Sequence, residues 1–144
     1  YQIARIEKKM QEPIIQTGHL KDKRNFTHIE DMVEAYWLAA KMCEPGELYL
    51  IGNSDAESVY TFEEILNKLI DISKINKNDI KIQTAKEYVR PTNVPFLVGD
   101  MSKFMHKTNW KPKINIDKIL SDTLNYWRDR IENEKFTQLN TGKE

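Results

Sequence analysis

Several features are scarce in this sequence of 144 residues, and each scarcity argues against a class of protein. A single cysteine, Cys43, cannot form a disulfide within the chain, and with only three separated histidines it gives no zinc-binding spacing. No apolar run approaches the roughly 20 residues of a transmembrane helix. Neither sign of charge is in excess, because Lys and Arg together number 22, as do Asp and Glu. We therefore expect a cytoplasmic protein without membrane or nucleic-acid contacts, and a small anionic ligand rather than a polyanion.

Glycine is too dispersed to build a phosphate-binding loop. The glycines are Gly18, Gly46, Gly52, Gly99 and Gly142. A dinucleotide-binding loop needs three glycines within about six residues, so that it can turn tightly and admit the pyrophosphate. No tyrosine is followed four residues later by a lysine, the pair used for carbonyl chemistry in some dehydrogenases. The sequence thus supplies no catalytic set, no coenzyme site and no metal site of its own.

The spacing of apolar residues predicts helices that alternate with short strands. Helical periodicity covers 2–11, 29–43, 62–72, 100–107 and 116–131, and strand-like runs cover 13–16, 48–51 and 80–83. This alternation indicates an α/β layered fold with some parallel pairing. The strands are few for a free-standing sheet, and the chain opens in what reads as the middle of a helix. We therefore expect part of a longer protein, with one region over 1–135 and a frayed tail over 136–144.

Local signals predict where helices begin and which faces are buried. Thr27 with Glu30, and Thr61 with Glu64, fit the capping-box pattern, and Asn115 can cap the last helix. One side of each of three helices is predicted to be buried. These sides consist of Ile29, Met32, Val33, Tyr36, Ala40 and Cys43 after Thr27; of Phe62, Ile65, Leu66, Leu69 and Ile72 after Thr61; and of Ile116, Ile119, Leu120, Thr123, Leu124, Trp127 and Ile131 after Asn115. The continuous apolar run at 48–51 predicts a strand that is covered on both faces.

Two arginines are the leading candidates for ligand binding. Both are predicted to lie in loops: Arg24 just before a predicted helix start, and Arg90 in a segment that two prolines stiffen. A guanidinium group binds phosphate oxygens in a bidentate manner, and a rigid loop lowers the cost of ordering it. The alternative is that both arginines face solvent or pair with nearby acids such as Glu30 and Glu87. His28 could act as an acid or base, but its place at a helix start favours a packed histidine.

Around these arginines the sequence resembles the extended short-chain dehydrogenase/reductases that act on nucleotide sugars. Residues 24–32 are similar to the family's Arg-Asp-Phe segment and the Val-x-Asp helix start that follows, although Asn25 replaces the usual Asp. Residues 47–52 are similar to its Tyr-Asn-Ile-Gly strand. Residues 11–15, 90–95 with 99–103, and 108–112 are similar to the GDP-mannose 4,6-dehydratase branch, which includes a GDP-4-keto-6-deoxymannose reductase.

The resemblance implies a fold and an activity for the longer protein. This chain would be the C-terminal substrate-binding lobe, α/β in class, plus one or two strands of a Rossmann-type sheet. The intact homo-oligomeric enzyme would bind NADP, or NAD, through its N-terminal part, oxidise the sugar C4 of GDP-mannose, eliminate water across C5–C6 and return the hydride. This chain alone would hold no coenzyme and be inactive. The alternatives are part of the GDP-4-keto-6-deoxymannose reductase, or a non-catalytic nucleotide-sugar-binding or interaction module.

Five binding residues follow from the resemblance, and none of them is catalytic. Arg24 and Arg90 match the pair that grips the diphosphate or nucleoside end of the GDP-sugar. Asn93 falls where relatives carry an acidic residue that contacts the nucleotide. Gly18 and Leu20 lie on the loop that lines the nucleotide pocket. Because Asn93 matches neither the dehydratase nor the reductase acid, the choice between these two enzymes stays open.

Overall fold

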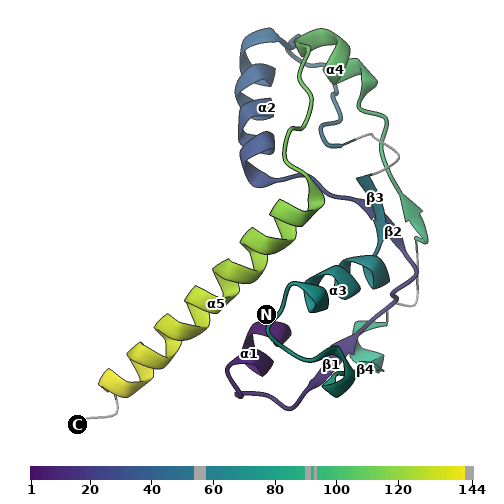
Figure 1. Ribbon diagram of the computed structural model, residues 1–144. Coiled ribbons are helices and arrows are strands. Elements are labelled where there is room, and N and C mark those ends of the chain that lie inside the picture. Colours follow the sequence, from purple (N-terminus) through teal and green to yellow (C-terminus); the bar gives the residue numbers. More distant parts are fainter. Residues whose placement is uncertain (54–57, 90–91, 93, 142–144) are drawn as a thin grey trace. The chain divides into compact units, whose positions relative to one another are not determined.

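The computed structural model describes residues 1–53, 58–89, 92 and 94–141, with side chains as far as residue 133 (Figure 1). The chain divides into two compact units, each assembled from segments that are distant in sequence. The first unit comprises Tyr1–His19, Ile65–Pro91 and Leu120–Glu144, and the second comprises Leu20–Glu64 and Thr92–Ile119. Within the described part of the chain, no helix combines the length and apolar character needed to span a membrane.

The first unit packs helices with a two-stranded parallel sheet. It contains α1 (Gln2–Glu7), β1 (Ile14–Thr17), most of α3 (Phe62–Asp71), η2 (Lys77–Asp79), β4 (Lys81–Thr84), η3 (Lys86–Tyr88) and most of α5 (Ile116–Thr141). Strands β1 and β4 run in parallel, from Ile14 opposite Lys81 to Thr17 opposite Thr84. The predicted strands at 13–16 and 80–83 are confirmed, each shifted by one residue.

Two helix starts in the structure follow the sequence signals. Thr61 Oγ1 accepts a hydrogen bond from Glu64 N at 3.1 Å, while Glu64 Oε2 accepts one from Thr61 N at 2.7 Å. This reciprocal pair is the predicted capping box, and it fixes the start of α3. Asn115 Oδ1 accepts from Lys118 N at 3.0 Å and caps α5 as predicted. The buried face of α5 is also confirmed at Ile116, Leu120, Leu124 and Ile131.

The second unit is built around a three-stranded sheet that the sequence did not reveal. It contains β2 (Lys23–Asn25), α2 (Ile29–Met42), β3 (Val59–Thr61), β5 (Phe96–Leu97) and α4 (Ser102–Thr108). The strand order is β3-β2-β5, with β2 antiparallel to β3 and parallel to β5. Since these strands have only two or three residues each, they show too little alternation to be recognised.

The core of the second unit lies between α2 and α4. Ala35, Phe104 and Trp110 are buried there, and Phe104 is completely enclosed. Its ring meets the Trp110 ring edge to face at a centroid distance of 5.6 Å. Ala35 has a small side chain, which allows α2 to approach these aromatic rings closely.

The predicted cap of α2 is wrong, and so is the predicted buried side. The N-cap residue is His28, whose Nδ1 accepts from Glu30 N at 3.2 Å, because Thr27 Oγ1 instead accepts from Asn53 N. The helix buries Asp31 and Ala35. The opposite side, which we term the outer stripe of α2, is exposed and consists of Ile29, Val33, Tyr36 and Trp37, each at least 60% accessible.

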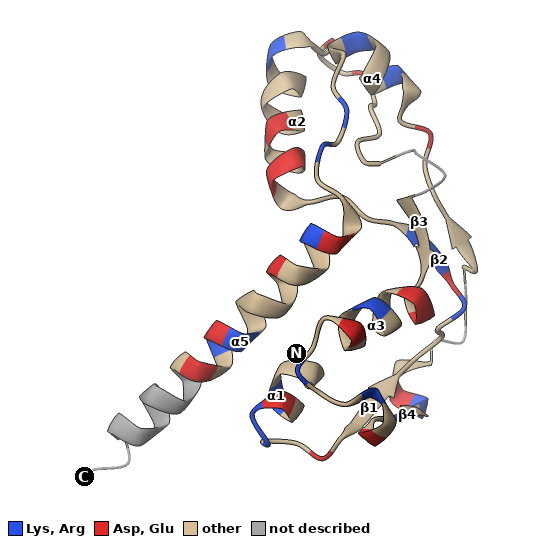
Figure 2. Ribbon diagram, viewed as in Figure 1, with Lys and Arg blue, Asp and Glu red and all other residues tan. Residues whose placement is uncertain are grey.

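The charges of α2 are placed favourably at both of its ends. Glu30 and Asp31 lie in its first turn, and Lys41 lies in its last, as the red and blue segments of this helix in Figure 2 show. Negative charge near the helix N-terminus and positive charge near the C-terminus both stabilise the helix dipole. The helix is therefore locally well formed, although one of its apolar sides has no cover among the described residues.

The strand predicted at 48–51 is not formed in the structure. Tyr49 and Ile51 pack against the Ala35–Phe104–Trp110 core, whereas Leu48 and Leu50 are exposed. The side chains thus alternate as they would in a strand. No described strand pairs with this segment, and an apolar run needs neighbouring strands before it can join a sheet covered on both faces.

Candidate functional site

Arg24 lies in the middle of β2, the central strand of its sheet. Tyr60 of β3 is its antiparallel partner, and Leu97 of β5 is its parallel partner. The prediction that Arg24 belongs to a loop is therefore wrong. Pairing on both edges fixes the backbone of Arg24 more firmly than a loop would, which suits a residue that must place a charge accurately.

Three groups surround the Arg24 guanidinium, whose side chain is 24% exposed. Nη1 donates a hydrogen bond to Lys23 O at 2.7 Å, and Nη2 lies 4.0 Å from Asp22 Oδ2. The guanidinium carbon lies 5.8 Å from the centre of the Phe62 ring, a cation–π distance. The acidic neighbour is Asp22, not the Glu30 that sequence proximity suggested. Neither Asp22 nor Phe62 was among the predicted site residues.

Gly18 makes a close contact that only glycine permits. A Cβ atom at this position would lie 2.4 Å from Tyr88 O, far inside van der Waals contact. Gly18 directly follows β1, and Tyr88 ends η3, shortly after β4. The two segments leave the carboxyl ends of paired parallel strands, where Ala85 N donates to Thr17 O at 2.9 Å. The loop that carries Gly18 is thus packed against the backbone that leads to Arg90.

The other predicted binding residues are placed unequally. Leu20 is partly buried, and its carbonyl accepts a hydrogen bond from Glu63 N at 2.9 Å at the start of α3. Arg90 and Asn93 lie outside the described residues. Beyond Asn93 the chain enters β5, and Pro95 O accepts from Lys23 N at 2.8 Å. The strand that carries Arg24 is therefore bonded to the segment that follows Asn93.

Asn25, which departs from the resembled motif, makes a bond that Asp could not make. Its Nδ2 donates to Asn53 O at 2.6 Å, and a carboxylate has no proton to donate. Thr27 Oγ1 accepts from Asn53 N at 3.0 Å, so both backbone groups of Asn53 are held. Gly52 lies beside them, and a Cβ there would come within 2.8 Å of Met101 Cε. The substitution therefore replaces a charge with a direct link to the 52–53 turn.

His28 has a structural role. It is 7% exposed, and its Nδ1 accepts a hydrogen bond from Glu30 N at 3.2 Å. The packed interpretation of His28 is confirmed. In the part of the chain that the structure describes, no three His, Cys, Asp or Glu side chains are grouped to hold a metal ion.

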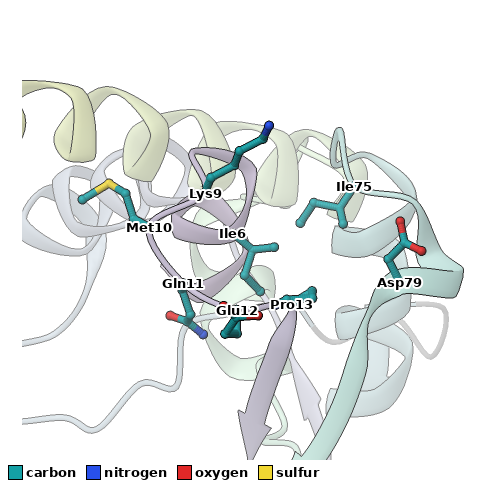
Figure 3. Close-up of a pocket in the computed structure, with 8 residues that line it drawn as sticks. All are labelled: Ile6, Lys9, Met10, Gln11, Glu12, Pro13, Ile75 and Asp79. Atoms are coloured by element: carbon teal, nitrogen blue, oxygen red, sulfur yellow. The ribbon is translucent and has the colours of Figure 1, made fainter.

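A surface hollow of about 630 Å³ lies in the first unit. Figure 3 shows its lining, which consists of Ile6, Lys9, Met10, Gln11, Glu12, Pro13, Ile75 and Asp79. Lys9 and Asp79 flank the hollow on either side of Ile75 in that view. The three predicted binding residues that the structure describes, Gly18, Leu20 and Arg24, are not among these lining residues.

The sequence matches a protein-family model and several curated relatives. The model for GDP-mannose 4,6 dehydratase matches residues 1–123. GDP-mannose 4,6 dehydratase of Cricetulus griseus is 35% identical over 120 residues, which cover 73% of this chain and 32% of that protein. dTDP-D-glucose 4,6-dehydratase of Homo sapiens is 30% identical over 114 residues, which cover 78% of this chain and 31% of that protein. The chain spans about a third of the length of these relatives.

Solved structures share the fold. RMD from Pseudomonas aeruginosa, complexed with NADPH, superposes with a TM-score of 0.78 at 24% identity, over 90% of this chain and 40% of that chain. dTDP-glucose 4,6-dehydratase from Bacillus anthracis, complexed with NAD, gives a TM-score of 0.71 at 17% identity, over 91% and 39% of the two chains. These likenesses confirm the predicted fold class, an α/β segment of the extended short-chain dehydrogenase type.

Proposed function

This chain belongs to the GDP-mannose 4,6 dehydratase family, and we propose that it forms the nucleotide-sugar-binding part of an enzyme that converts GDP-mannose to GDP-4-keto-6-deoxymannose. The family match over residues 1–123 is the observation that supports this most strongly. The setting of Arg24 adds chemical support, because a guanidinium held on a doubly paired strand is suited to binding a diphosphate.

The proposed binding residues are those that match the family motif. Arg24 and Arg90 bind the diphosphate or nucleoside end of the GDP-sugar, and Gly18, Leu20 and Asn93 line the nucleotide pocket. Two contacts of the described backbone support this assignment. The close approach at Gly18 orders the chain that leads to Arg90, and the bond from Lys23 N to Pro95 O orders the chain that follows Asn93.

The glycines that the structure describes do not form a dinucleotide-binding loop. Gly18, Gly52 and Gly99 each face protein atoms within 3.2 Å of where a Cβ would lie, so they serve packing, and Gly46 lies alone in the turn after α2. The part of the intact enzyme beyond this chain is proposed to hold NADP or NAD, and the NADPH and NAD in the two similar structures support a nicotinamide coenzyme.

The outer stripe of α2 supports the proposal that the functional enzyme is larger than this chain. A helix that is apolar on two sides is normally buried on both. We propose that the remainder of the enzyme covers this stripe, together with Leu48 and Leu50. The intact enzyme is proposed to be a cytoplasmic homo-oligomer, which sedimentation of the full-length protein would test.

The deciding experiment incubates the intact enzyme with GDP-mannose and NADP and measures the sugar-nucleotide product and NADPH. The proposal expects GDP-4-keto-6-deoxymannose to accumulate with no net formation of NADPH. A reductase would instead leave GDP-mannose unchanged and consume NADPH when given the 4-keto sugar nucleotide, and a binding module would do neither. The isolated chain should turn over no GDP-mannose, with or without NADP, so product from it would contradict the proposed division of the enzyme.

Calorimetric titration tests the guanine assignment separately. GDP is expected to bind the intact enzyme more tightly than UDP does. Arg90→Ala should weaken GDP binding by about 1–3 kcal/mol through the loss of a charge-assisted contact. Equal or tighter binding of UDP would point to another sugar nucleotide within the same fold.

A further inference from the structure

The side chains around Arg24 converge on one face of β2. Because residues alternate across a strand, Asp22, Arg24 and Phe26 project to the same side. The Phe62 ring lies over this side, 5.8 Å from the Arg24 guanidinium carbon and 6.3 Å from the Phe26 ring centre in an edge-to-face contact. Phe62 therefore contacts two alternate residues of the strand at once.

The backbone holds Phe62 in this position. Phe62 N donates to Asp22 O at 3.2 Å, which extends the pairing between β2 and β3 by one step. Phe62 is also the first residue of α3, whose start is fixed by the bonds between Thr61 and Glu64. The backbone that carries the ring is thus fixed beside the strand of Arg24.

Phe62 contributes little to the core of α3. The buried residues of that helix are Ile65, Leu66 and Ile70, whereas Phe62 is 37% exposed. The apolar spacing of the sequence predicted Phe62 to join the buried stripe, and that prediction is wrong. The Phe62 ring is therefore only partly buried, and it lies against the Arg24 guanidinium.

We propose that Phe62 is a positioning residue, which together with the Asp22 carboxylate holds the Arg24 guanidinium ready for the anionic part of the nucleotide sugar. This inference rests on the proposed role of Arg24 in binding. The ring supports one face of the guanidinium, while Asp22 and Lys23 O constrain its Nη atoms. The bond to Lys23 O uses one of the five N–H groups of an arginine side chain. A long, flexible side chain that is held before the ligand arrives loses less entropy on binding.

The test is a double-mutant cycle in the intact enzyme, with the dissociation constant for GDP measured by calorimetry. Phe62→Leu removes the π face but keeps an apolar side chain, and it should weaken GDP binding about 3- to 10-fold. Phe62→Tyr keeps the ring, so its affinity for GDP should stay close to that of the natural protein. In an Arg24→Ala background, Phe62→Leu should cause no further loss, because no guanidinium remains to be positioned. Tyr126→Leu on α5, an exposed aromatic far along the sequence, serves as the matched control.

The outcomes separate this inference from the proposed function. If Arg24→Ala leaves GDP affinity unchanged, the binding role of Arg24 fails, and the inference fails with it. If Arg24→Ala weakens binding but Phe62→Leu weakens it equally in both backgrounds, or if Phe62→Tyr behaves like Phe62→Leu, only the positioning role is overturned. Should Phe62→Leu fail to fold, Phe62→Met gives the same comparison with an unbranched side chain.

Discussion

Arg128 on α5 donates two hydrogen bonds to the carboxylate of Glu7 at the end of α1, from Nε to Oε2 at 2.7 Å and from Nη2 to Oε1 at 2.6 Å. The Glu7 side chain is 5% exposed, and its Oε1 also accepts from Lys74 N at 2.9 Å. Three segments of the first unit, far apart in sequence, therefore meet at one carboxylate. A buried charge of this kind stabilises the fold only while all its partners are in place.

Removing the guanidinium should destabilise the protein markedly. Arg128→Met keeps the apolar part of the side chain but leaves the Glu7 carboxylate without its charged partner. The free energy of unfolding, measured by urea denaturation, should fall by about 2–3 kcal/mol. Glu132→Gln is the matched control, since Glu132 of α5 pairs with Lys8, the C-cap residue of α1, but is 63% exposed. Its loss should stay below about 1 kcal/mol, and equal losses for the two variants would contradict the special role of Arg128.

The same carboxylate should make stability depend on pH in the acid range. Burial raises the pKa of Glu7, but the hydrogen bonds from Arg128 and Lys74 N outweigh it, so that the pKa lies below its ordinary value of 4.5. A lowered pKa in the folded state contributes stability that is fully present above 4.5 and is lost as the pH falls through the folded value.

Glu7→Gln isolates this contribution. At neutral pH the variant should be less stable than the natural protein, and the difference should shrink as the pH falls below 4.5. Urea denaturation of both proteins at a series of pH values measures it. The comparison is needed because hydrogen bonds also lower the pKa of exposed Glu47, Glu64 and Asp100, so the acid sensitivity of the whole protein has several sources. A difference that stays constant with pH would contradict the prediction.

Asp31, in the helix start that resembles the family motif, links two distant segments of the second unit. It is 3% exposed, and its Oδ2 accepts from Lys113 N at 3.1 Å and from Ile114 N at 3.0 Å. Asp31→Ala should lower the free energy of unfolding by about 2–3 kcal/mol, because two backbone donors lose a charged acceptor. Asp31→Asn keeps an acceptor oxygen and should cost less.

Glu34 provides the control for Asp31 on the same helix. It binds Lys113 through the side-chain Nζ at 2.8 Å, and both side chains are exposed. Glu34→Gln should change the free energy of unfolding by no more than about 0.5 kcal/mol. If the Asp31 and Glu34 variants were equally stable in thermal and urea unfolding, burial would not be what makes Asp31 important.

Signals that act over a few residues could be predicted from the sequence, and contacts between distant segments could not. The capping box at Thr61 and the buried face of α5 depend on local spacing, and both are confirmed. β2 consists of Lys, Arg and Asn, and its partners at 59–61 and 96–97 are remote, so no local pattern marks it as a strand. For α2, apolar residues occur on two sides, and only the packing of Ala35 against Phe104 and Trp110 shows which side is buried.

The candidate site divides in the same way. Arg24 could be chosen from residue type and from the motif around it. The groups that hold its guanidinium could not, because Phe62 reaches it through the pairing of β2 with β3 and otherwise looks like a core residue of α3. The link from Asn25 to Asn53 depends equally on tertiary structure.

Gly18 should be more sensitive to substitution than its loop position suggests. In Gly18→Ala, the added Cβ would lie 2.4 Å from Tyr88 O, so one of the two backbone segments must move. Since Tyr88 leads to Arg90, GDP binding by the intact enzyme should weaken along with stability. Gly46→Ala is the control, because Gly46 has a φ of 82° and open space around it. Gly46→Ala should cost about 1 kcal/mol of stability through backbone strain and leave the dissociation constant for GDP unchanged. Loss of GDP affinity in both variants would show that the Gly18 contact has no particular effect on binding.

A charge introduced into the outer stripe of α2 should destabilise the protein strongly only when the rest of the enzyme is present. Val33 is 60% exposed in this chain, so Val33→Asp should change the stability of the isolated chain by about 0.5 kcal/mol or less. In the intact enzyme, where we propose that the stripe is covered, the same substitution buries an unpaired carboxylate and should cost more than about 2 kcal/mol. Glu30→Gln changes an exposed residue outside the stripe, in the first turn of the same helix, and should cost no more than about 1 kcal/mol in both proteins. Urea denaturation of the two proteins side by side measures the contrast, and an equal response to Val33→Asp would mean that this face of α2 stays in contact with water in the complete enzyme.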